Sequence, residues 1–222
     1  MNLRIFENLD DLIHAAARTL MQRIEAGART IALSGGNTPK PLYQLLGQND
    51  ELREKPVTWV VVDERYVPID DPQSNAGMIE KTLKPERLLR FKTELDDPAR
   101  SADEFEREWR DLKIEHLDLA VLGMGDDGHT ASLFPGTDVL AVEDRIAAAV
   151  YVPKMNSWRV TLTKPVLRAA GLRIVLAAGA SKRPILQEVR AGAEYPIALV
   201  TSGVETWWFV DRAAAPDMSP RP

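Results

Sequence analysis

The sequence predicts an α/β protein, a three-layer α/β/α sandwich with a mostly parallel central sheet. Short apolar runs alternate with helical segments along the chain, and no linker-like stretch interrupts them. Several of these runs are apolar at nearly every position, which is typical of strands buried on both faces of a parallel sheet. The length of 222 residues suits one large domain. We therefore predict a single α/β domain over residues 1–212 and a loose tail over residues 213–222.

Periodicity and turn residues place the elements of the first half of the chain. Apolar residues recur at helical spacing from Leu9 to Ala26, and Gly27 stands where a glycine commonly ends a helix. The run VTWVVV at residues 57–62 is the strongest strand signal in the chain. In order, the predicted elements are a helix over 9–26, a strand over 30–33, a helix over 41–48, a strand over 57–62, a helix of about a dozen residues from Ala76 and a helix over 98–112.

The second half begins with a strand over Leu117–Leu122, followed by a glycine-rich loop that holds Asp126, Asp127 and His129. Residues 129–134 (HTASLF) have room only for a short helical turn before the next proline and glycine. Residues 159–163 (RVTLT) alternate as in a half-exposed strand. The remaining predicted elements are strands over 146–152 and 159–163, a helix around residue 167, a strand over 172–178, a helix over 184–191 and strands over 197–200 and 206–210.

Polar clusters follow four of the predicted strands. They are Ser34–Gly36, Asp63–Arg65, Asp126–His129 and Ser181–Lys182. The carboxyl ends of parallel strands lie at one edge of a sheet, where ligands of open α/β proteins bind. Each cluster also has an ordinary explanation: Asp63 and Arg65 would equally cap a helix, and the glycine turn would equally be a tight connection. Their coincidence at strand ends favours a common site.

His129 is the strongest candidate for chemistry among the three histidines of the chain. It stands in a glycine-rich loop beside two aspartates, whereas His14 and His116 are best explained as ordinary surface or core residues. An unperturbed imidazole titrates near pH ~6.5, so it accepts a proton at neutral pH without special tuning.

Composition disfavours several functional classes. The net charge is −5 and no run of Lys and Arg occurs, which argues against a nucleic-acid partner. No apolar stretch approaches the ~20 residues of a membrane span, and the first residues lack the apolar core of a secretory signal. There are no cysteines and no histidine pair at ligand spacing, so we expect no metal site. The expectation is a cytoplasmic protein, away from membranes, and a monomer or weak homo-oligomer.

The glycine-rich loop and its partner motifs resemble those of the 6-phosphogluconolactonases. Residues 123–135 (GMGDDGHTASLFP) are similar to the GxGxDGHxASLFP signature of that family. The resemblance spans about residues 3–212 in family order, except that the stretch before Arg159 lacks the usual prolines and carries Trp158. The other matching segments are SGGNTP at 34–39, DERYVP at 63–68, Ser74-Asn75, RVTLT at 159–163 and GASK at 179–182.

The resemblance implies hydrolysis of the small-molecule lactone 6-phospho-D-glucono-1,5-lactone to 6-phospho-D-gluconate, without a cofactor or metal. It implies His129 as general base, Asp127 as the group that orients the loop or the imidazole, and Arg65 or the loop amides at the oxyanion. Arg159, Lys182 and the 34–38 turn are expected to form one phosphate site away from His129. The implied substrate-binding residues are Ser34, Gly35, Gly36, Thr38, Asp63, Asn75, Thr130, Arg159 and Lys182.

Two alternatives remain. An amino-sugar-phosphate deaminase or isomerase shares the implied fold, but its loop carries a glutamate at the position of Phe134 and an aromatic residue at that of Arg65. A non-catalytic module that senses sugar phosphates is the second alternative. The complete histidine loop argues against it.

Overall fold

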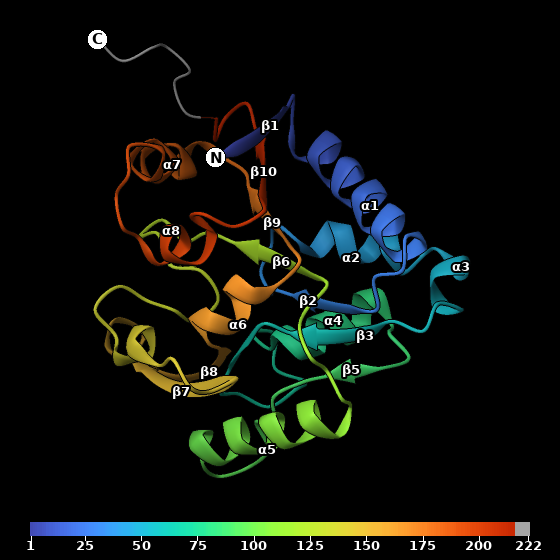
Figure 1. The fold of residues 1–222 in the computed structure, drawn as a ribbon, viewed down its shortest axis with the longest axis vertical. Helices are drawn as coiled ribbons and strands as arrows, with labels where there is room; N and C mark the ends of the chain where they lie inside the picture. The colour runs from blue at the N-terminus through green and yellow to red at the C-terminus, as the bar shows by residue number, and fades with distance from the viewer. Residues whose placement is uncertain (216–222) are drawn as a thin grey trace.

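The computed structural model describes residues 1–215, and its centre is a seven-stranded parallel sheet in the order β1-β10-β9-β6-β2-β3-β5. Helices cover both faces of this sheet (Figure 1), which confirms the predicted α/β/α class. The strands are β1 (Asn2–Phe6), β2 (Thr30–Leu33), β3 (Thr58–Val61), β5 (Leu88–Leu89), β6 (Leu119–Gly123), β9 (Leu172–Ala177) and β10 (Thr206–Asp211).

The helices form two layers. α1, α2 and α4 lie on one side of the sheet, and α6, α7 and α8 lie on the other (Figure 1). The helices are α1 (Leu9–Glu25), α2 (Lys40–Leu46), α3 (Asp50–Arg53), α4 (Asn75–Leu83), α5 (Pro98–Asp111), α6 (Lys164–Ala169), α7 (Arg183–Arg190) and α8 (Pro196–Thr201).

The central strands are buried along their length. Residues 119–122 of β6 and all of β9 are buried, as expected for strands covered by helices on both faces. Each fully buried Leu, Ile or Val side chain contributes roughly 1.5–3 kcal/mol relative to an exposed one. This burial explains why the strand ends, with their polar clusters, are held in fixed positions.

A second sheet, which the sequence did not predict, lies beside the first. β4 (Asp63–Arg65), β8 (Ser157–Leu162) and β7 (Ala147–Val152) form it in the order β4-β8-β7, with antiparallel pairing. Only residues 153–156 join β7 to β8, far fewer than the dozen or more that a parallel crossover needs. These two strands therefore form a hairpin and do not enter the parallel sheet.

Residues 159–162 do lie in a strand, β8, but the prediction that this strand is half exposed is wrong. Arg159 to Leu162 are all buried, because α5 packs against both strands of the hairpin (Figure 1). The alternation of apolar and polar residues predicted one buried and one solvent-exposed face of the strand. In the structure both faces of residues 159–162 are buried.

Two other local predictions were also wrong. Residues 197–200, expected as a strand, belong to helix α8, which starts at Pro196; so short an apolar run does not distinguish the two. HTASLF forms no helical turn, since Thr130 and Leu133 make an isolated β-bridge with Ala131 at φ +52°. The short sheet-edge strands β1 and β5 were missed.

The end of the described chain packs on the domain. Residues 213–215, predicted as the start of a loose tail, form a turn in which Ala214 is buried and its N–H donates to Asp211 Oδ1 over 2.7 Å. The rest of that predicted tail, residues 216–222, lies outside the described residues.

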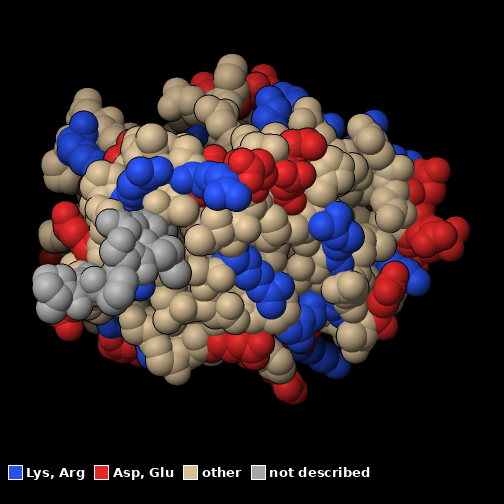
Figure 2. Space-filling model, turned by 90° about the horizontal axis from the view of Figure 1, so that it is seen from above, with Lys and Arg blue, Asp and Glu red and all other residues tan. Residues whose placement is uncertain are grey.

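The surface mixes both signs of charge. On the face shown in Figure 2, basic and acidic side chains are interspersed. Within residues 1–215, no helix is both long enough and apolar enough to cross a membrane.

Candidate active site

A pocket of about 260 Å³ lies where β2, β6 and β9 of the large sheet end beside β4 and β8 of the small sheet. Every predicted site residue except Asp127 lines it, so the structure brings the four polar clusters together. These residues are Ser34, Gly35, Gly36, Thr38, Asp63, Arg65, Asn75, His129, Thr130, Arg159 and Lys182. Sequence reasoning did not select Ser132, Phe134 and Met155, which also line the pocket.

The glycine-rich loop after β6 is tightly folded. Gly128 has φ +75°, and a Cβ there would lie 2.4 Å from the ring of Tyr195, so only glycine fits this position. The N–H of Gly125 donates to the carbonyl of His129 over 2.8 Å, and the hydroxyl of Thr130 donates to the carbonyl of Gly123 over 2.8 Å. These contacts hold His129 at the pocket.

Asp127 lies behind the imidazole and orients it. Its Oδ1 contacts Nδ1 of His129 and also accepts the backbone N–H of His129 over 3.2 Å. A carboxylate at Nδ1 keeps the ring proton there, so Nε2 is the proton acceptor of the neutral ring. The ring of Phe134 stacks on the imidazole with centroids 4.2 Å apart. A general base with an orienting carboxylate needs this arrangement of the two side chains.

Burial lowers the pKa of His129 from 6.5 to about 4. Asp63 opposes this shift, whereas the nearby cations Lys182, Arg159 and Arg65 add to it. The unperturbed value assumed from the sequence is therefore wrong. At neutral pH the imidazole is uncharged, as a proton acceptor must be.

The three charged residues after β3, Asp63, Glu64 and Arg65, have two different roles. The sequence left open whether Asp63 and Arg65 cap a helix or face a site, and the structure places both at the pocket. The three residues form β4, in which successive side chains point to opposite faces. Asp63 and Arg65 line the pocket, while Glu64 turns the other way and caps α4. A period of two was the available signal that residues 63 and 65 share a face.

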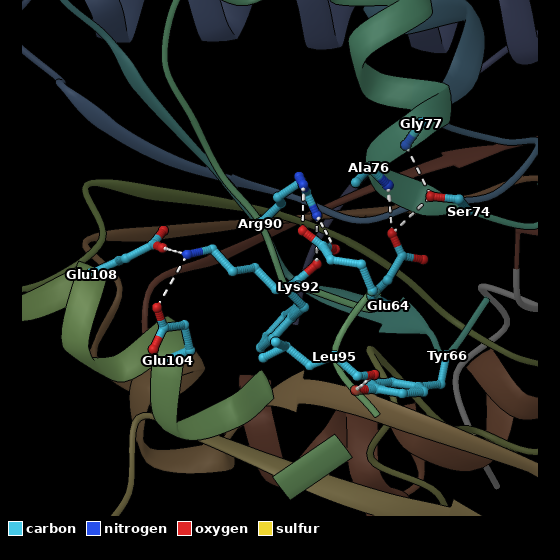
Figure 3. Close-up of polar contacts among 12 residues, drawn as sticks. Glu64, Tyr66, Ser74, Ala76, Gly77, Arg90, Lys92, Leu95, Glu104 and Glu108 are labelled. Carbon is cyan, nitrogen blue, oxygen red and sulfur yellow. Dashed lines mark hydrogen bonds and ion pairs between the residues drawn. The ribbon is translucent and has the colours of Figure 1, made fainter. Parts of the chain in front are cut away.

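Glu64 is buried beside the start of α4 and accepts four hydrogen bonds, of which Figure 3 shows those from Ala76 and Ser74. Its Oε1 accepts the N–H groups of Arg65 and Asn75 over 2.8 and 2.7 Å, and its Oε2 accepts the N–H of Ala76 and the hydroxyl of Ser74 over 2.7 and 3.1 Å. Burial raises the pKa of Glu64, although the backbone donors oppose the shift. Sequence reasoning missed this residue as a support of the site.

Asn75 joins α4 to Asp63 of β4 and packs against the glycine turn after β2. Asn75 Nδ2 donates to the carbonyl of Asp63 over 2.7 Å, and the Asp63 carboxylate accepts the hydroxyl of Ser132 over 2.7 Å. A Cβ at Gly35 would lie 1.7 Å from Asn75 Oδ1, so a side chain there has no space. This close approach explains the glycine in the turn.

Arg65 and Arg159 are register partners on β4 and β8. The sequence predicts different roles for them, Arg65 at the oxyanion and Arg159 at the phosphate, and the structure places the two residues side by side. Arg159 is buried, and burial and the charge of Arg65 lower the pKa of its guanidinium. Among the described residues, Arg159 Nε and Ser34 Oγ are buried without a hydrogen-bond partner. Two neighbouring cations and two unused donors make an anion-binding wall.

Lys182 is already paired. Its ammonium lies 2.6 Å from Oδ1 of Asp126, and the Ser181 hydroxyl reaches the same oxygen over 3.3 Å. Lys182 and Arg159 line the same pocket, and the expectation that both hold one anion stays a prediction. Within residues 1–215, no group of three acidic or histidine side chains is arranged to hold a metal ion.

Comparison with known proteins identifies the family that the sequence motifs resemble. The family model described as glucosamine-6-phosphate isomerases/6-phosphogluconolactonase matches residues 7–208. A 6-phosphogluconolactonase of Synechocystis sp. is 37% identical over 226 residues, which cover 94% of this chain and 92% of that protein.

Two solved structures share the architecture. The crystal structure of 6-phosphogluconolactonase from Thermotoga maritima is 29% identical with a TM-score of 0.84, over 95% of this chain and 99% of that one. The 6-phosphogluconolactonase from Trypanosoma cruzi is 29% identical with a TM-score of 0.86, over 96% and 95% of the two chains. With a family match over most of its length, this chain belongs to the family of glucosamine-6-phosphate isomerases and 6-phosphogluconolactonases.

Proposed function

We propose that this chain is an enzyme that hydrolyses 6-phospho-D-glucono-1,5-lactone to 6-phospho-D-gluconate, a step of the oxidative pentose phosphate pathway. The observation that carries the proposal is the neutral imidazole of His129, oriented by Asp127 in the pocket that Arg159 also lines. The relatives named 6-phosphogluconolactonases support it.

In the proposed reaction, Nε2 of His129 takes a proton from water as the water oxygen attacks C1 of the lactone. Asp127 stabilises the imidazolium that forms. The tetrahedral intermediate carries an oxyanion, for which Arg65 and the amides of the glycine-rich loop are the proposed donors. His129 then gives its proton to the ring oxygen as the C1–O bond breaks. A positioned base of this kind contributes typically ~10²–10⁴-fold in rate.

The phosphate of the substrate is proposed to bind the side of the pocket that Arg159 and Ser34 form. Arg159 Nε and Ser34 Oγ are buried donors without partners, and Gly35, Gly36 and Thr38 of the turn after Ser34 line the same pocket. Lys182 contributes from the rim, where a phosphate dianion competes with the exposed carboxylate of Asp126 for its ammonium. The reaction needs neither a cofactor nor a metal ion.

Phe134 argues against the deaminase or isomerase alternative. Its ring stacks on His129 at the position where that alternative needs a glutamate, and a phenyl ring transfers no proton. The sensing module is disfavoured by the orienting carboxylate at His129, which a site for binding alone does not require. We further propose a cytoplasmic location and a monomer or weak homo-oligomer. Sedimentation of the purified protein at several concentrations tests the oligomeric state.

Acid release from freshly prepared lactone separates the three candidates. We expect release well above the spontaneous rate measured without protein. Ammonia release from glucosamine-6-phosphate would instead support the deaminase. Tight binding of 6-phosphogluconate with acid release at the spontaneous rate would support the sensing module and contradict the proposal.

A further inference from the structure

The hairpin between β7 and β8 reaches across to the glycine-rich loop. At its tip, the ammonium of Lys154 pairs with Oδ2 of Asp127, whose other oxygen holds Nδ1 of His129. The same ammonium lies 4.9 Å from the centroid of the Phe134 ring, which stacks on the imidazole. Lys154 therefore contacts both residues that hold the imidazole, although it lies outside the lining of the pocket.

We propose that Lys154 is a positioning residue for the lactone-hydrolysing reaction, acting on His129 through Asp127. This inference rests on the proposed function. The side chain of Asp127 is 32% exposed, and a carboxylate in contact with water can rotate away from an imidazole. With one oxygen on His129 and the other on Lys154, the Asp127 carboxylate cannot rotate without breaking an ion pair. Lys154 thus keeps the proton on Nδ1 and Nε2 free.

Such a role concerns orientation and not folding. Lys154 is half exposed, and an exposed ion pair contributes little to stability. Misplacement of a catalytic group by about 1 Å, in contrast, can cost up to ~10²-fold in rate. The structure therefore separates the two effects: loss of Lys154 should lower the rate and leave the melting temperature unchanged.

Contacts within the hairpin and with the pocket fix the position of the hairpin tip, residues 153–156. Met155 lines the pocket, and its sulfur lies 3.3 Å from Nη2 of Arg159. Asn156 closes the tip at φ +45° and accepts the hydroxyl of Tyr151, whose ring packs on Trp158 with centroids 5.4 Å apart. Met155, Asn156 and Trp158 belong to the stretch before Arg159 that departs from the family pattern. They explain how the tip holds Lys154 in place despite that departure.

The charges around the imidazole predict how its titration changes. Asp63 from β4 favours the imidazolium, and so do Asp126 and Asp127 from the loop. Lys182, Arg159 and Arg65 disfavour it, and Lys154 adds a further cation through Asp127. Removal of the Lys154 charge should therefore raise the pKa of His129, so that activity falls at a higher pH than in the wild type.

The test compares Lys154→Met, Lys154→Arg and Lys164→Met. Lys164 pairs with Glu143 at the start of α6 and serves as the matched control, because it loses an ion pair outside the pocket. For Lys154→Met we expect a kcat about 10-fold lower, a KM within about twofold, an unchanged melting temperature and an acid limb displaced to higher pH. Lys154→Arg should restore most of kcat, and Lys164→Met should match the wild type.

Nitrogen NMR of His129 gives a readout that does not depend on turnover. In the wild type we expect the tautomer with the proton on Nδ1, and in Lys154→Met a mixture of tautomers and a raised pKa. An unchanged tautomer and pKa would overturn the inference even if the enzyme is a lactonase. Equal losses in Lys154→Met and Lys154→Arg, or a loss that follows the melting temperature, would also overturn it. Absence of acid release by the wild type would contradict the proposed function and leave the NMR comparison valid.

Discussion

The two carboxylates that support the pocket, Glu64 and Asp127, are held in opposite ways. Glu64 is 1% exposed, and its partners are three backbone N–H groups and one hydroxyl, none of which changes charge. The side chain of Asp127 is 32% exposed, and besides the His129 N–H its partners are two ionisable side chains, His129 and Lys154. Backbone donors hold Glu64 in a fixed position, whereas the ionisable partners of Asp127 suit it to the proton transfer that we propose.

Replacement of His129 by alanine should produce the largest effect, and only on chemistry. We expect kcat/KM to fall at least ~10²-fold, the low end for loss of a general base, while the fold stays intact. Initial rates of acid release and a circular dichroism spectrum measure the two quantities. A folded variant with near wild-type turnover would show that His129 is not the base and that Asp127, like Glu64, has only a structural role.

Arg159→Ala should weaken binding of the phosphorylated lactone by ~1.5–3 kcal/mol, roughly 10- to 150-fold, because hydrogen bonds to charged groups are lost. The loss should be much smaller for the lactone without phosphate, which never made the contact. Lys182→Ala should lose less, since Lys182 already has Asp126 as partner.

Competition by inorganic phosphate, measured for both variants, distinguishes binding from structure. Equal losses on the two lactones would mean that Arg159 supports the fold or the chemistry, and not the phosphate.

Glu64→Gln should lower stability, because the amide NH₂ group would face N–H donors and leave hydrogen bonds unmade. We expect a loss of about 1–3 kcal/mol in the free energy of unfolding. The melting temperature should fall by about 2–4 °C for each kcal/mol. Asp127→Asn is the matched control, with the same chemical change on the more exposed carboxylate.

For that control we expect a lower kcat and a nearly unchanged melting temperature. Denaturant titration and initial rates of both variants test the contrast. If the two variants lost stability equally, the proposed difference between the structural role of Glu64 and the catalytic role of Asp127 would be wrong.

The smallest effect should be the response to pH near neutrality. The imidazole of His129 acts as a base only when neutral, and burial lowers its pKa to about 4, so protonation removes activity only at acid pH. We expect kcat/KM to change by less than about twofold between pH 6 and 8 and to fall toward pH 4. Rates corrected for spontaneous hydrolysis give the profile. An acid limb near pH ~6.5 would mean that the imidazole is solvated as in a free peptide.

The sequence by itself determined the fold class and most of the polar residues of the pocket. Apolar runs flanked by helical periodicity predicted the parallel sheet, and their polar ends predicted its ligand-binding edge. In a strand over residues 63–65, alternation already implies that Asp63 and Arg65 share one face and that Glu64 points to the other. These features depend on neighbouring residues, and local periodicity records them.

The tertiary structure alone decided which distant groups meet. Arg65 faces Arg159 only because β4 pairs with β8, and Lys154 reaches Asp127 only because the hairpin tip folds over the loop. The lowered pKa of His129 likewise comes from burial and from charges on other elements. Such neighbours are separated by long stretches of chain, and only the packing of the two sheets brings them within contact, which no local pattern encodes.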